Sequence, residues 1–230
     1  MRNYLFFLFT LVGVTANAAD PGFRLFTDPQ GREMQAKLTR VSGDDVYIER
    51  QDGLATKVDI SIFSPDDQAY IRDWEKKDAW SRKLELRFKS HITDRKGWDG
   101  HPIARKTWKE GYEIVVKNET AFAMEDVRLE YRVFKFEDAM AAQKRSEGEV
   151  KKIKGAAKVK NIPAWSEEIS ATSQFPMRET KLASGYYWTG GGKKKSRDYM
   201  EGVWVRVYVD DFLAHETTQP ENLNRNAGWD

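Results

Sequence analysis

The chain has 230 residues and no cysteine, and its 38 lysines and arginines nearly balance its 36 aspartates and glutamates, giving a formal net charge of +2. The lack of cysteine excludes disulfides, a cysteine nucleophile and a lipid attached through cysteine. A charge this close to neutral does not favour nucleic acid as a partner. The aromatic content of 13% favours packed sheets and contact surfaces over disordered linkers.

Residues 1–18 have the pattern of a secretory signal peptide. Arg2 precedes an apolar run from Tyr4 to Val14, and small residues follow as far as Ala18. The run is shorter than the roughly 20 residues that a membrane-spanning helix needs. We therefore predict an exported protein, periplasmic or secreted, with no stable membrane insertion after signal cleavage. Retention of the segment as an anchor is the alternative.

Residues 22–75 show short strands separated by turns. Met34, Ala36 and Leu38 alternate with polar residues, which is the period of a sheet with one buried face. Turn-forming residues at 42–44 and 51–53 then reverse the chain into two further strands. Strands this short and closely joined must curl to bury their apolar face, which predicts a small Src-homology-3-like barrel.

A helix is predicted to begin after Ser64, which can cap free backbone amides. Pro65 suits the first helical position, and Asp66 and Asp67 oppose the positive end of the helix. Ile71 and the tryptophan three residues later give the helix an apolar stripe to lay against the barrel. Residues 76–83 either extend this helix or form a polar linker.

The turns and the helix start of residues 22–75 follow the order of a known module. The features that carry this likeness are the segments Arg24–Asp28 and Ser64–Ile71 and the glycines at 31, 43 and 53. The segment resembles the first Sla homology domain, a compact Src-homology-3-like barrel of yeast endocytic adaptors and of exported proteins from planctomycetes and verrucomicrobia. In the adaptors the module binds a short Asn-Pro-Phe-x-Asp peptide, so the resemblance implies a peptide-binding surface here.

A peptide with Phe and Asp needs an aromatic wall and a cation. We nominate Phe26, Tyr47 and Arg50 as peptide-binding residues, although Phe26 stands where the family frequently has tryptophan. The alternative is that Phe26 belongs to the core and that Arg50 is an ordinary solvated strand residue.

Residues 84–230 return to a sheet pattern. Leu84, Leu86 and Phe88 alternate with charged residues, and we expect a long loop over 93–106. Further strands are predicted at 112–116, 127–136, 169–175, 182–188 and 203–209. Roughly six to eight strands without helical periodicity predict an antiparallel β-sandwich of immunoglobulin or fibronectin style, and the missing disulfide favours the latter. The chain is therefore expected to be all-β.

No pattern of catalytic chemistry stands out. There is no Gly-x-Ser-x-Gly turn, and the glycines before Lys193 lack the spacing of a phosphate-binding loop. His91, His101 and His215 lack the spacing of a preformed zinc pair; the alternative is that His91 and His101 meet in space and share a metal with Asp94 or Asp99. We predict a protein with no catalytic residue, no metal and no cofactor.

Exposed aromatic rings offer a second kind of site. Trp98 and Trp188 are candidates for stacking on sugar rings, with core packing and loop anchoring as the alternative. Our leading hypothesis is an exported, non-catalytic protein that binds a protein or peptide partner like an adaptor. The alternative is a carbohydrate-binding accessory protein of the cell envelope, and the third hypothesis is an enzyme with an unrecognised site.

Overall fold

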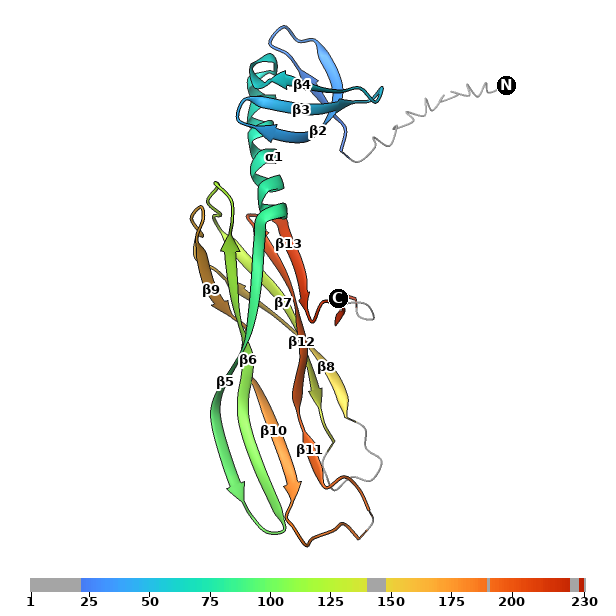
Figure 1. The fold of residues 1–230 in the computed structure, drawn as a ribbon, viewed down its shortest axis with the longest axis vertical. Coiled ribbons are helices and arrows are strands. Elements are labelled where there is room, and N and C mark those ends of the chain that lie inside the picture. The colour runs from blue at the N-terminus through green and yellow to red at the C-terminus, as the bar shows by residue number, and fades with distance from the viewer. Residues whose placement is uncertain (1–21, 140–147, 190, 224–227, 230) are drawn as a thin grey trace, which may run out of the picture. The chain divides into compact units, whose positions relative to one another are not determined.

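The computed structural model describes residues 22–139, 148–189, 191–223 and 228–229. The expected signal peptide, residues 1–18, lies outside this part of the chain. The fold is all-β with one α-helix and several antiparallel sheets, as expected (Figure 1). The chain divides into two compact units, Met1–Glu75 and Lys76–Asp230. None of the helices in the described residues is both long enough and apolar enough to cross a membrane.

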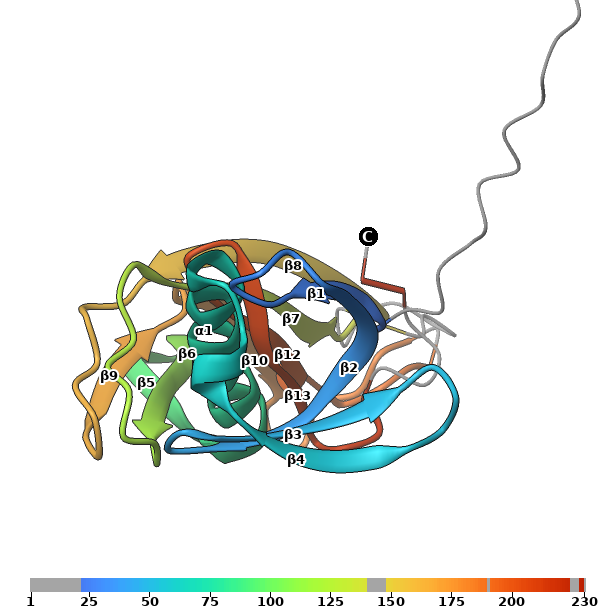
Figure 2. The same ribbon diagram turned by 90° about the horizontal axis from the view of Figure 1, so that it is seen from above.

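The first unit is a four-stranded antiparallel sheet in the order β1-β2-β3-β4. Its elements are β1 (Arg24–Thr27), β2 (Glu33–Ser42), β3 (Asp45–Arg50), β4 (Ala55–Asp59), the 3-10 turn η1 (Ile60–Ile62) and the start of α1 (Pro65–Lys83). The sheet curls round one side of the helix (Figure 2). The helix is continuous through residues 76–83, so these residues extend it rather than form a linker.

The apolar faces of the curled sheet and the helix enclose a small core. Its buried residues are Phe26, Ala36, Val46, Ile48, Ile60, Phe63 and Ile71. Val46 and Ile48 come from the alternation in β3, and Ile71 comes from the predicted stripe of α1. The barrel thus obtains its core from positions that sequence periodicity identifies.

Asp67 connects the start of α1 to β1. It is 3% exposed, and its carboxylate accepts hydrogen bonds from the backbone N–H of Thr27 at 2.7 Å and from the Arg24 guanidinium at 3.1 Å. The Thr27 and Ser64 hydroxyls also donate to it. Burial raises the pKa of Asp67, but these hydrogen bonds outweigh burial and lower it overall. The carboxylate therefore holds the helix start and the first strand together.

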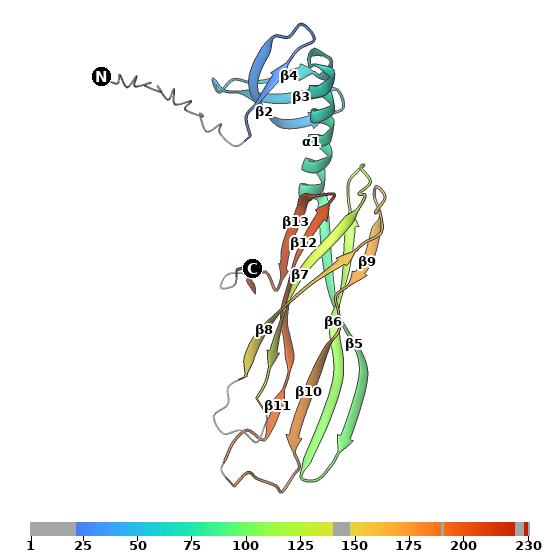
Figure 3. The same ribbon diagram turned by 180° about the vertical axis from the view of Figure 1, so that it is seen from behind.

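The second unit contains two antiparallel sheets (Figure 3). One has the order β11-β10-β6-β5, with β9 also paired to β6, and the other has the order β13-β12-β7-β8. The strands are β5 (Leu84–Asp99), β6 (Ile103–Asn118), β7 (Val127–Glu137), β8 (Glu149–Lys158), β9 (Glu167–Ala171), β10 (Phe175–Leu182), β11 (Lys195–Arg197), β12 (Tyr199–Val209) and β13 (Phe212–Gln219).

The core of the second unit joins both sheets. Ile114 and Val116 of β6 and Val133, Val205 and Val207 of the other sheet are all fully buried. The predicted alternation in residues 203–209 is confirmed, because the odd-numbered valines lie in the core.

Three predicted elements of this unit were wrong. The long loop expected over 93–106 is mostly strand, because β5 and β6 form a hairpin that turns only at residues 100–102. The strand expected over 169–175 is the end of β9 and the first residue of β10, separated at 172–174. The strand expected over 182–188 is irregular after Leu182. Strands β8 and β13 were not predicted, and both alternate less clearly than β12 does.

Candidate binding groove

The residues nominated for peptide binding do not share a surface. Phe26 is 1% exposed and packs against the ring of Phe63 at 5.3 Å. Tyr47 lies between two buried residues of β3, so its side chain is on the opposite face of the sheet. Arg50 is exposed at the end of β3 and pairs with Asp52 at 2.8 Å. The structure therefore places Phe26 in the core, away from the other two.

The two nominated tryptophans have different surroundings. Trp98 in β5 is 58% exposed and lies opposite Arg105 of β6. Trp188 lies in the irregular segment after β10, where its indole N–H donates to the carbonyl of Lys193 at 3.1 Å. Arg105 and Lys106 are neighbours on β6, so their side chains point to opposite faces of the sheet. Trp98 shares the face of Arg105, whereas Lys106 lines a groove on the other face.

One face of β6 changes from core to open surface along its length. Val116 and Ile114 are buried, and the same face continues through Glu110 and Trp108 to Lys106. Trp108 is half-buried, whereas Lys106 is exposed. The far end of this sheet therefore presents its inner face to solvent, and it forms a concave surface there.

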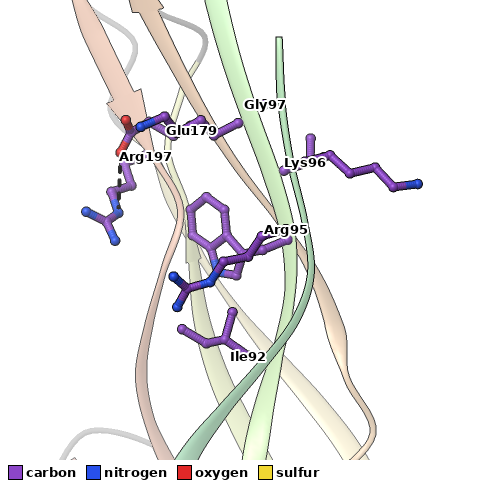
Figure 4. A pocket seen from close by; sticks show the side chains of 9 residues that line it. Ile92, Arg95, Lys96, Gly97, Glu179 and Arg197 are labelled. Atoms are coloured by element: carbon purple, nitrogen blue, oxygen red, sulfur yellow. Dashed lines mark ion pairs between the residues drawn. The ribbon is translucent and has the colours of Figure 1, made fainter.

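A row of four side-chain positions crosses this surface in register. Gly97 of β5 lies opposite Lys106, Lys106 lies opposite Glu179 of β10, and Glu179 lies opposite Arg197 of β11. Directly opposite residues share a face of the sheet. These four residues and Trp108 line a hollow of about 360 Å³ (Figure 4). No atom lies within 4 Å of where a Cβ on Gly97 would stand, so this position leaves the hollow open.

A second row extends the hollow towards the hairpin tip. Asp99, Ala104, Lys181 and Lys195 are opposite one another on the same four strands. They line a hollow of about 310 Å³ that shares Lys106 and Glu179 with the first. We refer to these two adjoining hollows as the basic groove.

A β-bulge places Arg95 beside the groove. Asp94 and Arg95 both stand opposite Trp108, since the pairing of β5 with β6 shifts between Thr93 and Lys96. Asp94 has a φ of 51°, and its carboxylate pairs with Lys109 at 2.8 Å. The hydrogen bond and charge of Lys109 lower the pKa of Asp94. Arg95 and Lys96 point in opposite directions, with Arg95 on the side of Arg197 (Figure 4).

Trp108 forms an anchored aromatic wall of the groove. Its indole N–H donates to Glu110 at 2.9 Å, and the Ser90 hydroxyl donates to the same carboxylate at 2.9 Å. The guanidinium of Arg197 lies 5.6 Å from the indole centre. The hydrogen bonds at Glu110 therefore hold the indole in one orientation. Tyr112 is the next residue on this face after Glu110, and burial and the Glu110 charge raise its pKa to about 12.

Positive charge dominates the groove. Its lining contains six cationic side chains and two carboxylates: Arg95, Lys96, Lys106, Lys181, Lys195, Arg197, Asp99 and Glu179. Glu179 is engaged by Lys195 at 3.2 Å and by Arg197 at 3.6 Å. Among the described residues, four of these cations form no ion pair, Arg95, Lys96, Lys106 and Lys181, and of the four only Lys96 points away from the groove (Figure 4). Three cations are thus left without an internal counter-charge in a concave surface.

Sequence reasoning missed this groove because it assigned residues 93–106 to a loop. Lys106 and Trp108 are two residues apart, so they share a face once this segment is known to be a strand. That spacing was the available signal. The pairing with Glu179 and Arg197 had no local signal.

No group of three or more metal-ligating side chains is found within the described ranges. No protein-family model matches the chain, and no curated protein is similar to it. The chemistry of the groove therefore has to indicate what the protein binds.

Proposed function

We propose that the chain is an exported, non-catalytic binding protein that captures an anionic partner in the basic groove. The observation that carries this proposal is the set of three unpaired cations, Arg95, Lys106 and Lys181, around a concave surface. A partner with negative groups supplies the missing counter-charges. Because these three cations form no ion pairs within the protein, none has to be broken when the partner binds. The signal-peptide pattern of residues 1–18 supports export.

The state of the carboxyl groups favours binding over acid–base chemistry. In the part of the chain that the structure describes, each carboxyl whose pKa departs from its ordinary value, such as Asp94, Asp138 and Glu137, has that pKa lowered by cations or hydrogen bonds. A general acid at neutral pH requires a raised pKa instead. The adaptor-like role expected for the first unit stays a prediction. One residue nominated for it, Phe26, is buried in the core and cannot form the aromatic wall of a surface groove.

The proposal is tested by binding to immobilised polyanions at several salt concentrations. The purified chain should bind dextran sulfate, polygalacturonate or poly-L-glutamate but not neutral dextran, and added salt should weaken binding because it screens exposed charges. The double variant Arg95→Glu and Lys106→Glu should weaken this binding at least about tenfold.

A matched control variant changes the net charge of the chain by the same amount, but at residues outside the basic groove. Lys154→Glu and Lys158→Glu reverse two exposed charges on β8, in the other sheet. This variant should bind nearly as the unaltered chain does. Absence of polyanion binding by the unaltered chain, or an equal loss in both double variants, would refute the proposal.

A further inference from the structure

We infer that the anionic partner of the basic groove is an acidic polysaccharide, a chain of sugar rings that carry carboxylate or sulfate groups. This inference rests on the proposed function and specifies its ligand. It depends on three features of the groove: its position on a sheet face, its anchored indole, and its mixture of cations with carboxylates.

The groove lies on the face of the sheet and reaches from one edge strand, β5, to the other, β11. Its central strands, β6 and β10, are paired on both sides, so backbone groups are left unpaired only along the outer sides of β5 and β11. A peptide recognised through its main chain normally adds to an unpaired strand edge, where it finds backbone hydrogen bonds. A peptide lying across this face would leave its own amides without such partners. A polysaccharide has no backbone amides to satisfy.

Trp108 provides a flat apolar face beside the cations. Its N–H is already bound to Glu110, so the ring plane is fixed before any ligand arrives. An aromatic face held in this way can stack against the apolar face of a sugar ring. Arg95 stands opposite Trp108 on β5, and Lys106 lies two residues from it along β6, so both can then reach acidic groups of the same or the next ring.

The carboxylates of the groove also favour a sugar over an acidic peptide. Glu179 stands in the middle of the first row, and Asp99 stands in the second. A carboxylate accepts hydrogen bonds, so it suits the hydroxyl groups of a sugar. The same carboxylates repel the acidic groups of either ligand, but the acidic side chains of a peptide offer them no hydroxyl group in exchange. Alternating cations and acceptors match a ligand that has both acidic groups and hydroxyls.

Two linked hollows indicate a ligand longer than one ring. They share Lys106 and Glu179 and extend along β5, β6 and β10 from Trp108 to Ser184. Their volumes, about 360 and 310 Å³, are in the range of small-ligand pockets. We infer that consecutive sugars occupy the two hollows, with one ring on Trp108.

The test compares saccharide and peptide polyanions. Binding of the unaltered chain is measured for polygalacturonate, dextran sulfate and poly-L-glutamate of similar length. At least one polysaccharide should bind about tenfold more tightly than poly-L-glutamate. Trp108→Ala should remove this preference, since it removes the stacking surface and leaves the cations. Comparison of the two polysaccharides shows which acidic group is preferred.

Two further measurements do not depend on how well the Trp108→Ala variant folds. Gly97→Tyr fills the first hollow without a change of charge, and it should weaken polysaccharide binding about tenfold, whereas Gly97→Ala should leave it nearly unchanged. In the unaltered chain, the indole N–H signal of Trp108 in a nuclear magnetic resonance spectrum should move on addition of polysaccharide. The Trp108→Phe variant assigns that signal.

The outcomes separate this inference from the proposed function. Equal or tighter binding of poly-L-glutamate, with no shift of the Trp108 signal, overturns the polysaccharide inference and leaves a groove for acidic peptides. No binding of any polyanion overturns both. A preference for polysaccharide that survives Trp108→Ala and Gly97→Tyr places the sugar elsewhere and also overturns the inference.

Discussion

Replacement of Asp67 tests whether its buried carboxylate joins the barrel strand to the helix. Asp67→Ala leaves the Thr27 N–H without its acceptor, at a cost of about 1–3 kcal/mol for an unsatisfied buried donor. It also removes a hydrogen bond within the first helical turn, and loss of a comparable helix cap costs about 1 kcal/mol. The Arg24 pair adds little, because the Arg24 side chain is 44% exposed. We expect a loss of about 3 kcal/mol in total.

A loss of this size is large for so small a unit. Stabilities of about 0.05–0.15 kcal/mol per residue give a unit of this length only a few kcal/mol. Hydrogen exchange followed by mass spectrometry reports the first unit separately within the full chain. Amides of β1 and of the first turns of α1 should exchange about a hundredfold faster in Asp67→Ala, since each 1.4 kcal/mol corresponds to about a factor of ten.

The neighbouring Asp66 is the matched control. Asp66 is exposed in the same helical turn, so Asp66→Asn removes the same charge without a buried acceptor. Asp67→Asn should accelerate exchange in β1, and Asp66→Asn should change it far less. Equal effects of the two variants would show that only the charge at the helix start matters, and would refute the role assigned to Asp67.

The same carboxylate predicts the acid sensitivity of the first unit. Because the pKa of Asp67 is lowered from 3.8 in the folded state, its stabilising effect is complete above that value. The effect is lost as the pH falls through the lower pKa of the folded protein. Protection of the β1 amides, expressed relative to their intrinsic exchange rate at each pH, should therefore fall below about pH 4 in the unaltered chain, and Asp67→Asn should lack this component.

Two predictions concern the second unit, and thermal unfolding of the full chain measures both. Gly155→Ala places a Cβ 2.3 Å from the buried ring of Tyr131, so we expect a loss of about 1–3 kcal/mol, whereas Gly97→Ala meets open space and should be nearly neutral. Asn118 is 1% exposed, and its amide donates to backbone carbonyls of two loops, at Phe122 and near residue 163. Asn118→Ala should cost about 2–3 kcal/mol and lower the unfolding temperature by about 6 °C. An unchanged unfolding temperature in either variant would contradict the corresponding contact.

Local patterns predicted the elements that have one buried face. The alternation around Ala36 and Val46 and the helix start at Ser64 appear in the structure where the sequence places them. These features follow from neighbouring residues, because period and capping act over a few positions. The all-β class and the two-sheet second unit follow from the same signals.

Periodicity failed where both faces of a strand are polar. From Thr93 to Lys106 the hairpin carries charged residues on either side, so alternation of apolar and polar residues disappears. One of these faces is the basic groove, most of whose charged residues are exposed. The prediction of a loop was therefore wrong at the place where the candidate site lies.

The sequence by itself determined which residues could form cores, strands and the helix start, since these depend on local periodicity and turn chemistry. Only the tertiary structure decided the candidate site. Lys106 is far in sequence from Glu179 and Arg197, and the alignment of the three residues depends on strand order and register. The bulge at Asp94 then turns Arg95 towards the groove. Register is set by long-range packing of the whole sheet, and no local pattern in these polar segments encodes it.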